Sequence, residues 1–470
     1  MERIFLLLIL LTSVKATFSW PIPDESPLGN DTIGTYIWAR VDNFDNENNQ
    51  TYKQYYKTLF EGNSELRILY VGGESENEVK PPSELLLAAD SKYKKLLEEL
   101  HGEFDATVYS LEHRYYDHSY PVHFPEKAED FKYLTSQQAL ADVANFINVQ
   151  NSLNEGKWIT IGGSYPGMLS LWFRQLYPKL TVGAIGSSSP VNAVVNFTSF
   201  FLVSQNGYKR RHPECHEKLK LAFDEFRGIL EKKTDLSILD QLYPNLTSVF
   251  DYNTAYGLNN IAYQVVSDAY TQIQTNIDGI CSTYNVSTEE PLVELAANFK
   301  QTADHIQDKH WGSWLWQVCN EFGFFYSPSH EEFQAKGTYD IKEVFQKECE
   351  LRFGKDYTYE QIEENVKKSL EYYGGDKPYK GSNAIISNSD LDPWSGQGVE
   401  KAESDTVKIF IIRNATHCDD LRAGNNADVL EARPLYIAEI RKWLKGSSHR
   451  QSISVFTIIL TCITLVAKLF

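Results

Sequence analysis

The stretch WITIGGSYPGMLSL, residues 158–171, decides the fold. It begins with a short apolar run, continues through the six residues Gly162 to Gly167, and ends in apolar residues at helical spacing. This succession of strand, tight turn and helix predicts a nucleophile elbow, which holds a serine on a strained turn above a sheet. Glycine before the serine removes a Cβ that would collide with the neighbouring strand, and the following helix directs its positive end towards an oxyanion. An ordinary turn with a solvent-facing Ser164 is the alternative.

One residue of the stretch departs from the usual elbow pattern. The G-x-S-x-G pattern places a small residue two positions after the serine, whereas this chain has Pro166 there and Gly167 one position later. Proline is accepted in the first turn of a helix, so the elbow stays feasible.

The composition limits the classes of function. A chain of 470 residues holds one large domain or two of ordinary size. Its 63 acidic and 45 basic residues give a formal charge of -18, which argues against nucleic acid, because a phosphate-binding face needs clustered Lys and Arg. We expect an acidic, soluble enzyme that works outside the cytosol.

Both ends carry targeting signals. Residues 1–19 have the basic start and short apolar core of a signal peptide. Six N-x-S/T sequons agree with passage through the secretory pathway, to an extracellular, lysosomal or cell-surface location: Asn30, Asn49, Asn196, Asn245, Asn285 and Asn414. Residues 447–470 end in an apolar run, which predicts a GPI signal or, as the competitor, a single membrane-spanning helix. A homodimer is an open alternative to the monomer.

The cysteine count indicates an oxidising compartment. Outside the C-terminal tail there are five: Cys215, Cys281, Cys319, Cys349 and Cys418. Two disulfides and one free thiol are the simplest arrangement.

Strand and helix patterns alternate up to about residue 193, which predicts a doubly wound, mostly parallel sheet. Residues 196–375 have helical periodicity almost throughout and are expected to form a cap inserted between residues 20–195 and residues 376–446. We expect a capping box at Thr135 with Gln138, and a closing helix from Pro434 to Leu444 that Gly446 stops. His305 and His310 lack a ligand motif, so no metal is predicted.

Four loops after predicted strands carry candidate chemistry. Gly72 and Gly73 follow the apolar run 66–71, where an α/β-hydrolase supplies an oxyanion-hole amide; a simple turn is the alternative. Residues 112–116 (EHRYY) predict a buried Glu-Arg ion pair, or else a solvated edge. Asp392 and His417 follow the last two strands, so that the order Ser, Asp, His matches α/β-hydrolases, in which the imidazole activates the serine and the carboxylate orients the imidazole.

Further motifs extend the comparison to a family. They are E-H-R-Y-Y from 112, Y-L-T-S-Q-Q-A-L-A-D from 133, G-G-S-Y from 162, W-x-W-Q-V-C-N-E-F-G from 314, S-N-S-D-L-D-P-W from 387 and T-H-C-D-D-L from 416. Together, over residues 35 to 445, the chain resembles the serine carboxypeptidase family of Pro-X carboxypeptidase, dipeptidyl peptidase II and thymus-specific serine protease. The segments at 321–325 and 417–418 are most similar to the thymus-specific branch.

The resemblance implies post-proline exopeptidase chemistry on peptide substrates, without a cofactor. Ser164 would be the nucleophile, His417 the base and Asp392, rather than Asp390, its partner. The roles that it further implies are oxyanion amides from Tyr165 and the Gly73 loop, a proline pocket of Met168, Phe324 and Trp394, disulfides Cys215–Cys281 and Cys319–Cys349, and a packed free thiol at Cys418.

The chain also departs from the family, since Asp117 and Ser389 stand where glycine is common. These positions and Pro166 make reduced activity an open question. A lipase or esterase on the same fold and a hydrolase-fold binding protein are the other hypotheses. Retention of Ser164, Asp392 and His417 argues against the binding protein.

Overall fold

The computed structural model describes residues 28–31, 33–74, 93–232, 236–300, 312–375 and 377–466, with side chains up to residue 446. The predictions of a signal peptide (1–19) and a C-terminal anchor (447–470), and those on His305 and His310, therefore fall outside the described side chains. Within the described residues, no helix combines the length and the apolar character that a membrane crossing requires.

A mixed sheet forms the centre of the protein. Among the described residues, nine strands form it in the order β1-β2-β3-β5-β4-β6-β7-β10-β11. Their bounds are β1 (Leu28–Asn30), β2 (Thr35–Arg40), β3 (Thr51–Phe60), β4 (Leu66–Val71), β5 (Thr107–Leu111), β6 (Lys157–Gly163), β7 (Gly183–Ser187), β10 (Ala384–Ser389) and β11 (Val407–Ile412). Pairing is antiparallel from β1 to β5 and parallel from β5 to β11. The sheet is that of an α/β-hydrolase, as predicted.

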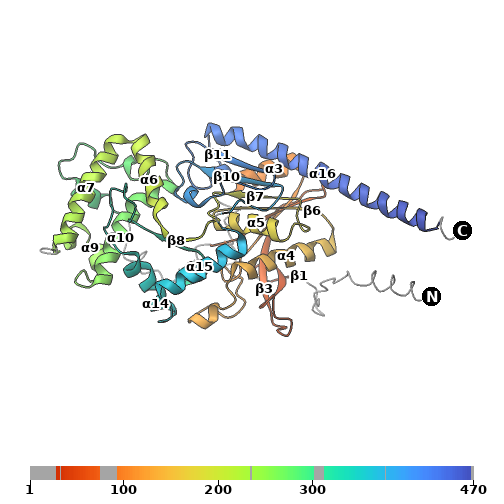
Figure 1. Cartoon of the computed structure of the whole chain (residues 1–470), viewed down its shortest axis with the longest axis horizontal. Helices are drawn as coiled ribbons and strands as arrows, with labels where there is room; N and C mark the ends of the chain where they lie inside the picture. Colours follow the sequence, from red (N-terminus) through yellow and green to blue (C-terminus); the bar gives the residue numbers. More distant parts are fainter. Residues whose placement is uncertain are drawn as a thin grey trace.

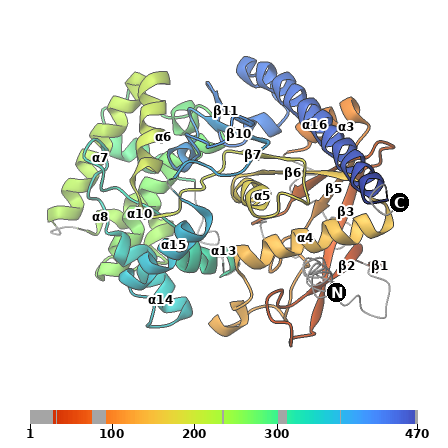
Figure 2. The same cartoon turned by 45° about the vertical axis from the view of Figure 1, so that its right-hand side comes forward.

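Helices cover both faces of the sheet (Figure 1). Helices α3 (Lys94–Phe104) and α16 (Ala427–Val466) lie on one face, and α4 (Ser136–Leu153) and α5 (Tyr165–Leu176) lie on the other (Figure 2). Alternate strand residues supply the two cores: Ile159 and Ile161 of β6 pack with α3 and α16, whereas Trp158 packs with α4 and α5. The doubly wound arrangement is thereby confirmed.

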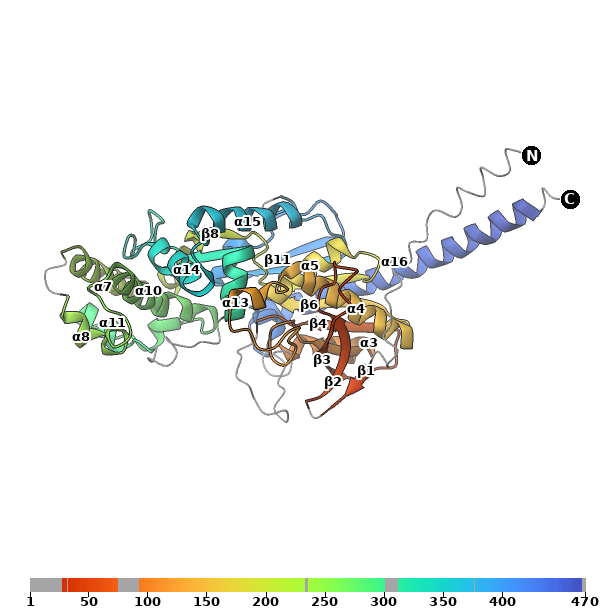
Figure 3. The ribbon, with the colours of Figure 1, turned by 90° about the horizontal axis from the view of Figure 1, so that it is seen from below.

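The segment between β7 and β10 is mainly helical. It contains α6 (Thr198–Arg211), α7 (Pro213–Lys232), α8 (Ile238–Leu242), α9 (Pro244–Thr247), α10 (Ala255–Thr271), α11 (Pro291–Ala297), α13 (Gly312–Gln317), α14 (Lys347–Phe353) and α15 (Tyr359–Tyr373). Helices α6 to α11 gather at one end of the molecule, on the side away from β1 and the end of α16 (Figures 1 and 3). The sequence did not predict the short parallel pair β8 (Val194–Phe197) and β9 (Gly323–Tyr326) inside this segment.

Two helix boundaries test the predictions made from capping signals. The Thr135 hydroxyl accepts from the Gln138 amide at 3.2 Å, as expected, but the Gln138 side chain bonds Asn43 and Asp42 instead of completing a capping box. The closing helix was predicted wrongly.

Helix α16 begins at Ala427 rather than at Pro434, and it continues past Gly446. Its start is fixed by Asn426, whose side-chain oxygen accepts from the Asp428 amide at 2.9 Å and the Val429 amide at 3.2 Å. An asparagine N-cap of this kind outweighs the preference of proline for the first turn, and Pro434 is accommodated inside the helix.

Candidate active site

Ser164 lies on a strained turn between β6 and α5. Its backbone has φ 64° and ψ -134°, in a region that residues other than glycine rarely adopt. The first helical bond runs from the Met168 amide to the Ser164 carbonyl at 3.0 Å. A Cβ on Gly162 would lie 2.2 Å from the Pro166 carbonyl oxygen, so only glycine fits before this turn. The geometry is that of a nucleophile elbow.

Pro166 is accommodated by the loop after β4. It occupies the first turn of α5, where its missing N–H would have no helical partner. Its ring packs on Gly73, because a Cβ at Gly73 would lie 2.4 Å from Pro166 Cγ. The Gly72 amide is already bonded to the Leu111 carbonyl at 2.9 Å. The Gly73 loop thus lies directly against the elbow, and Tyr165 begins α5 with an amide that has no acceptor in its own helix.

Asp392 and His417 come together from the loops after β10 and β11. His417 Nδ1 lies 2.9 Å from Asp392 Oδ2 and 3.0 Å from Oδ1, and both residues are buried. Burial lowers the pKa of His417, but the Asp392 carboxylate and the Cys418 thiol outweigh it and raise that pKa well above the usual value. Asp390 instead accepts from the Asn414 amide at 2.7 Å.

The histidine loop packs against the elbow. A Cβ on Gly163 would lie 2.7 Å from the sulfur of Cys418, the residue after His417. Cys418 is free and buried, and its amide donates to the Ser188 hydroxyl at 2.9 Å. The thiol therefore fills the space next to the elbow.

Asp420 anchors the same loop, and its role was not predicted from the sequence. Its buried carboxylate accepts from the hydroxyls of Ser387 (2.6 Å), Tyr436 (2.9 Å) and Ser187. These donors come from β10, α16 and β7, so a single side chain ties three elements to the turn that carries His417. The motif T-H-C-D-D-L contained this signal, but the spacing alone could not say which aspartate turns inwards.

Glu74 is a second residue that the sequence did not single out. It follows Gly73, and its carboxyl interacts with the Ser164 hydroxyl through a hydrogen bond and with His417 through charge. Although part of the residue is exposed, desolvation of the carboxyl outweighs these interactions and raises its pKa to about 7. A titrating carboxyl therefore lies beside the candidate nucleophile.

The predicted pocket residues are all buried. The rings of Phe324 and Trp394 meet edge to face at 5.3 Å, and Trp394 lies 6.1 Å from the His417 ring. Gln274, from the helical segment, bonds the Trp394 indole through its side chain (3.1 Å) and the His417 amide through its carbonyl (3.2 Å). Met168 is fully buried in the first turns of α5.

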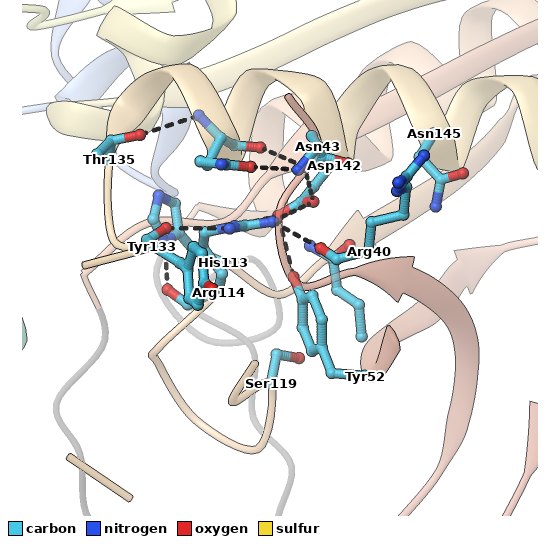
Figure 4. A network of polar contacts seen from close by, with 12 residues as sticks. Arg40, Asn43, Tyr52, His113, Arg114, Ser119, Tyr133, Thr135, Asp142 and Asn145 are labelled. Carbon is cyan, nitrogen blue, oxygen red and sulfur yellow. Dashed lines mark hydrogen bonds and ion pairs between the residues drawn. The ribbon is translucent and has the colours of Figure 1, made fainter. Parts of the chain in front are cut away.

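The predicted pair of Glu112 and Arg114 is wrong. Arg114 binds Asp142 of α4 instead, with Nε to Oδ2 at 2.6 Å and Nη2 to Oδ1 at 2.7 Å (Figure 4). Glu112 accepts from the Ser119 hydroxyl at 2.6 Å. Strand β5 ends at Leu111, so residues 112–116 lie in the turn that follows it, where Arg114 faces α4 and Glu112 faces the loop that carries Ser119.

The Arg114–Asp142 pair is fully buried and fully bonded. Arg114 also donates to the carbonyls of Val41 (3.1 Å), Tyr133 (3.0 Å) and Arg40 (3.2 Å). The Asp142 carboxylate also accepts from Asn43 (2.8 Å) and Tyr52 (3.0 Å). Such a pair fixes the turn after β5 to α4 (Figure 4).

Other predicted positions can be placed as well. Disulfides join Cys215 to Cys281 and Cys319 to Cys349, as the resemblance implied. All six sequon asparagines, at 30, 49, 196, 245, 285 and 414, are exposed. Asp117 has φ 49°, which explains a preference for glycine there, whereas Ser389 is simply buried in β10.

Comparison with known proteins identifies relatives along most of the chain. The family described as Serine carboxypeptidase S28 matches residues 39–311 and 259–434. The Caenorhabditis elegans protein F56F10.1 is 29% identical over 461 residues, which cover 86% of this chain and 83% of that protein. Lysosomal Pro-X carboxypeptidase of Mus musculus is 25% identical over 475 residues, 90% of this chain and 91% of that protein.

Thymus-specific serine protease of Homo sapiens is 25% identical over 392 residues, which cover 74% of this chain and 75% of that protein. Among solved structures, proline iminopeptidase of Mycobacterium smegmatis covers 87% of this chain and 99% of its own, with 12% identity and a TM-score of 0.35. A likeness at that score carries no argument about the site.

Proposed function

The chain belongs to the serine carboxypeptidase S28 family and is a serine-type exopeptidase, and we propose that it cleaves peptides after proline or small residues with Ser164, Asp392 and His417 as its triad. Two features of the structure support the proposal together. Ser164 lies on a strained turn, and the loop that carries His417, which is bonded to Asp392, packs against this turn. Peptides are the substrates of the family.

The proposed chemistry follows from these positions. Ser164 Oγ attacks the scissile carbonyl while His417 Nε2 takes its proton, and Asp392 holds the Nδ1–H tautomer and stabilises the imidazolium. His417 then passes the proton to the leaving amine, which leaves an acyl-enzyme that water hydrolyses by the same steps. The amides of Tyr165 and Gly73 would stabilise the oxyanion.

Specificity for proline is proposed from the aromatic surroundings of His417. Phe324 and Trp394 offer flat apolar surfaces that suit a pyrrolidine ring, with Met168 as the third wall. The name of the murine relative, Pro-X carboxypeptidase, supports the same choice. Carboxypeptidase and dipeptidyl peptidase specificity are distinguished by which end of the peptide must be free.

A fluorophosphonate probe tests the nucleophile. We expect labelling of the wild-type protein and none of Ser164→Ala, with Ser152→Ala as a control because Ser152 is an exposed serine of α4. Equal labelling of the wild type and Ser164→Ala would overturn the assignment. His417→Ala and Asp392→Ala should each lower kcat by about 10⁴-fold or more, as in other serine proteases.

A substrate panel tests the reaction class. Peptides with a penultimate C-terminal proline, X-Pro amides with a free N-terminus and simple esters should be compared at pH 5 and pH 7.5. Turnover of esters without any of the proline peptides would favour the esterase hypothesis. Turnover of the peptides with a penultimate C-terminal proline, without turnover of the X-Pro amides, would assign carboxypeptidase activity.

Passage through the secretory pathway is proposed from the two disulfides and the exposed sequons. We propose an extracellular, a lysosomal or a cell-surface location, the last through residues 447–470. Release of the protein from cells by a phosphatidylinositol-specific phospholipase would favour the cell-surface location. A peptide glycosidase that changes the mobility of the protein would support the pathway, and unmodified sequons in a secreting cell would contradict it.

A further inference from the structure

A chain of four buried side chains runs from the helical segment to the elbow. The Tyr165 hydroxyl lies 2.9 Å from His113 Nε2 and 2.8 Å from Gln317 Nε2. Gln317 Oε1 in turn accepts from the Tyr116 hydroxyl at 2.6 Å. All four side chains are buried. Tyr165 is the residue whose backbone amide the proposed oxyanion hole uses.

The direction of every hydrogen bond in this chain is fixed. His113 Nδ1 lies 2.7 Å from the Arg114 carbonyl, which can only accept, so Nδ1 carries the proton and Nε2 is an acceptor. Tyr165 must therefore donate to His113, and its oxygen can accept only from the amide nitrogen of Gln317. The Gln317 oxygen is then left for the Tyr116 hydroxyl. One arrangement satisfies all four groups.

The four side chains keep this arrangement of hydrogen bonds at physiological pH. Burial lowers the pKa of His113 to about 4, so the imidazole stays neutral and continues to accept. The chain also crosses between two parts of the fold, because Tyr116 and His113 follow β5 while Gln317 ends α13. The Tyr165 ring packs further against Trp314 (5.7 Å) and Phe322 (5.3 Å) of the same helical segment.

We propose that Gln317 and His113 are positioning residues, which hold Tyr165 from both sides so that its amide stays aimed at the oxyanion. The proposal rests on the proposed function. It adds that the helical segment supports the chemical step through Gln317, in addition to shaping the substrate site. An oxyanion donor acts only when it is held in place before the charge forms, and displacement by about 1 Å can cost about 100-fold in rate.

Two substitutions test this series of hydrogen bonds while leaving the backbone amides intact. Gln317→Met removes the bond to Tyr165 and the bond from Tyr116, and Tyr165→Phe removes both side-chain bonds of Tyr165 but keeps its ring and its amide. Gln205→Met is the matched control, because Gln205 is also buried and makes two bonds, to Glu332 (2.9 Å) and from Gln334 (2.8 Å), that stay within the helical segment. Steady-state kinetics on the best peptide from the panel give kcat and KM.

We expect Gln317→Met and Tyr165→Phe to lower kcat by about 10- to 100-fold with KM changed less than about threefold, because the lost contact acts on the oxyanion. Affinity for a peptide boronate, whose adduct mimics the tetrahedral intermediate, should fall by a similar factor. The double variant should have the kcat of Tyr165→Phe alone, since Tyr165→Phe already removes the bond through which Gln317 positions Tyr165. Gln205→Met should keep wild-type kcat.

Wild-type kcat in Tyr165→Phe, or losses that multiply in the double variant, would overturn the proposal, and so would an equal loss of kcat in Gln205→Met. If Gln317→Met does not fold, Tyr165→Phe alone decides between the outcomes. A wild-type protein that neither turns over peptides nor reacts with the fluorophosphonate would instead overturn the proposed function and this proposal together.

Discussion

Replacing Asp142 by asparagine should destabilise the protein far more than removing an exposed ion pair. The change preserves the shape of the side chain but leaves the Arg114 guanidinium buried and unpaired, with an amide N–H facing its donors. Loss of one partner from a buried pair costs about 3–5 kcal/mol of unfolding free energy. The carboxylate also accepts from Asn43 and Tyr52, so two further buried donors lose part of their acceptor.

The exposed pair Lys220–Asp224 provides the control. Its atoms are 2.7 Å apart, with side-chain exposures of 50% and 41%, on one face of α7. Lys220→Met should cost about 0.3–0.5 kcal/mol, because an exposed helical pair is screened by water. The two changes therefore differ by about tenfold in free energy although both remove one charge from an ion pair.

Denaturant unfolding of both variants, followed by intrinsic tryptophan fluorescence, measures the difference. Arg114→Leu combined with Asp142→Leu should recover only part of the loss, because the carbonyls that Arg114 bonds would have no donor. A shift for Asp142→Asn within about 1 kcal/mol of the Lys220→Met shift would refute the assignment of a tightly coupled buried pair.

Three further changes test other parts of the site. Glu74→Gln should remove a fall in kcat/KM above about pH 7, because ionised Glu74, with its pKa of about 7, would place negative charge beside the oxyanion; an unchanged profile would exclude this role. Burial raises the pKa of Glu321 to about 7 and that of Asp268 to about 6, so their contribution to stability is complete below about pH 4 and is lost as pH rises through 6–7. The protein should therefore unfold at a lower temperature at pH 8 than at pH 5, and Glu321→Gln should reduce this difference. An equal difference in the wild type and in Glu321→Gln would contradict the prediction. Gly73→Ala should lower kcat at least tenfold because its Cβ would meet the ring of Pro166, and Pro166→Ala in the same chain should restore part of the activity; failure of this rescue would show that the contact is not the cause.

Local patterns were sufficient to predict the α/β-hydrolase sheet and to place Ser164, Asp392 and His417 in the segments that follow its strands; the choice of Asp392 over Asp390 came from the family resemblance. The strand residues alternate between two cores, and this periodicity is visible in the sequence without knowledge of their partners. The elbow was also predictable, because the strained φ of Ser164 requires glycine-rich surroundings that are adjacent in sequence. His417 and Asp392 follow strands, and parallel strands bring such loops to one edge.

Contacts between distant elements were not predictable in the same way. The nearest carboxylate to Arg114 in sequence is Glu112, and no sequence pattern favours Asp142, which lies 28 residues further along the chain on the neighbouring helix α4. Asn426 was missed for a related reason, since Pro434 offered a competing helix start. In both cases, the position of a packed helix decided the outcome.

The departure at Pro166 is explained only when two loops are considered together. Considered alone, it replaces a small residue and suggests a weakened elbow. In the structure its ring occupies the space that a Cβ at Gly73 would need, so the missing small residue after the serine is balanced by a glycine in the loop after β4. The same contact sets the Gly73 loop against Tyr165, and these two residues would supply the oxyanion amides. Pro166 therefore stiffens the proposed oxyanion hole, because it fixes the loop that carries the Gly73 amide to the first helical turn, which carries the Tyr165 amide.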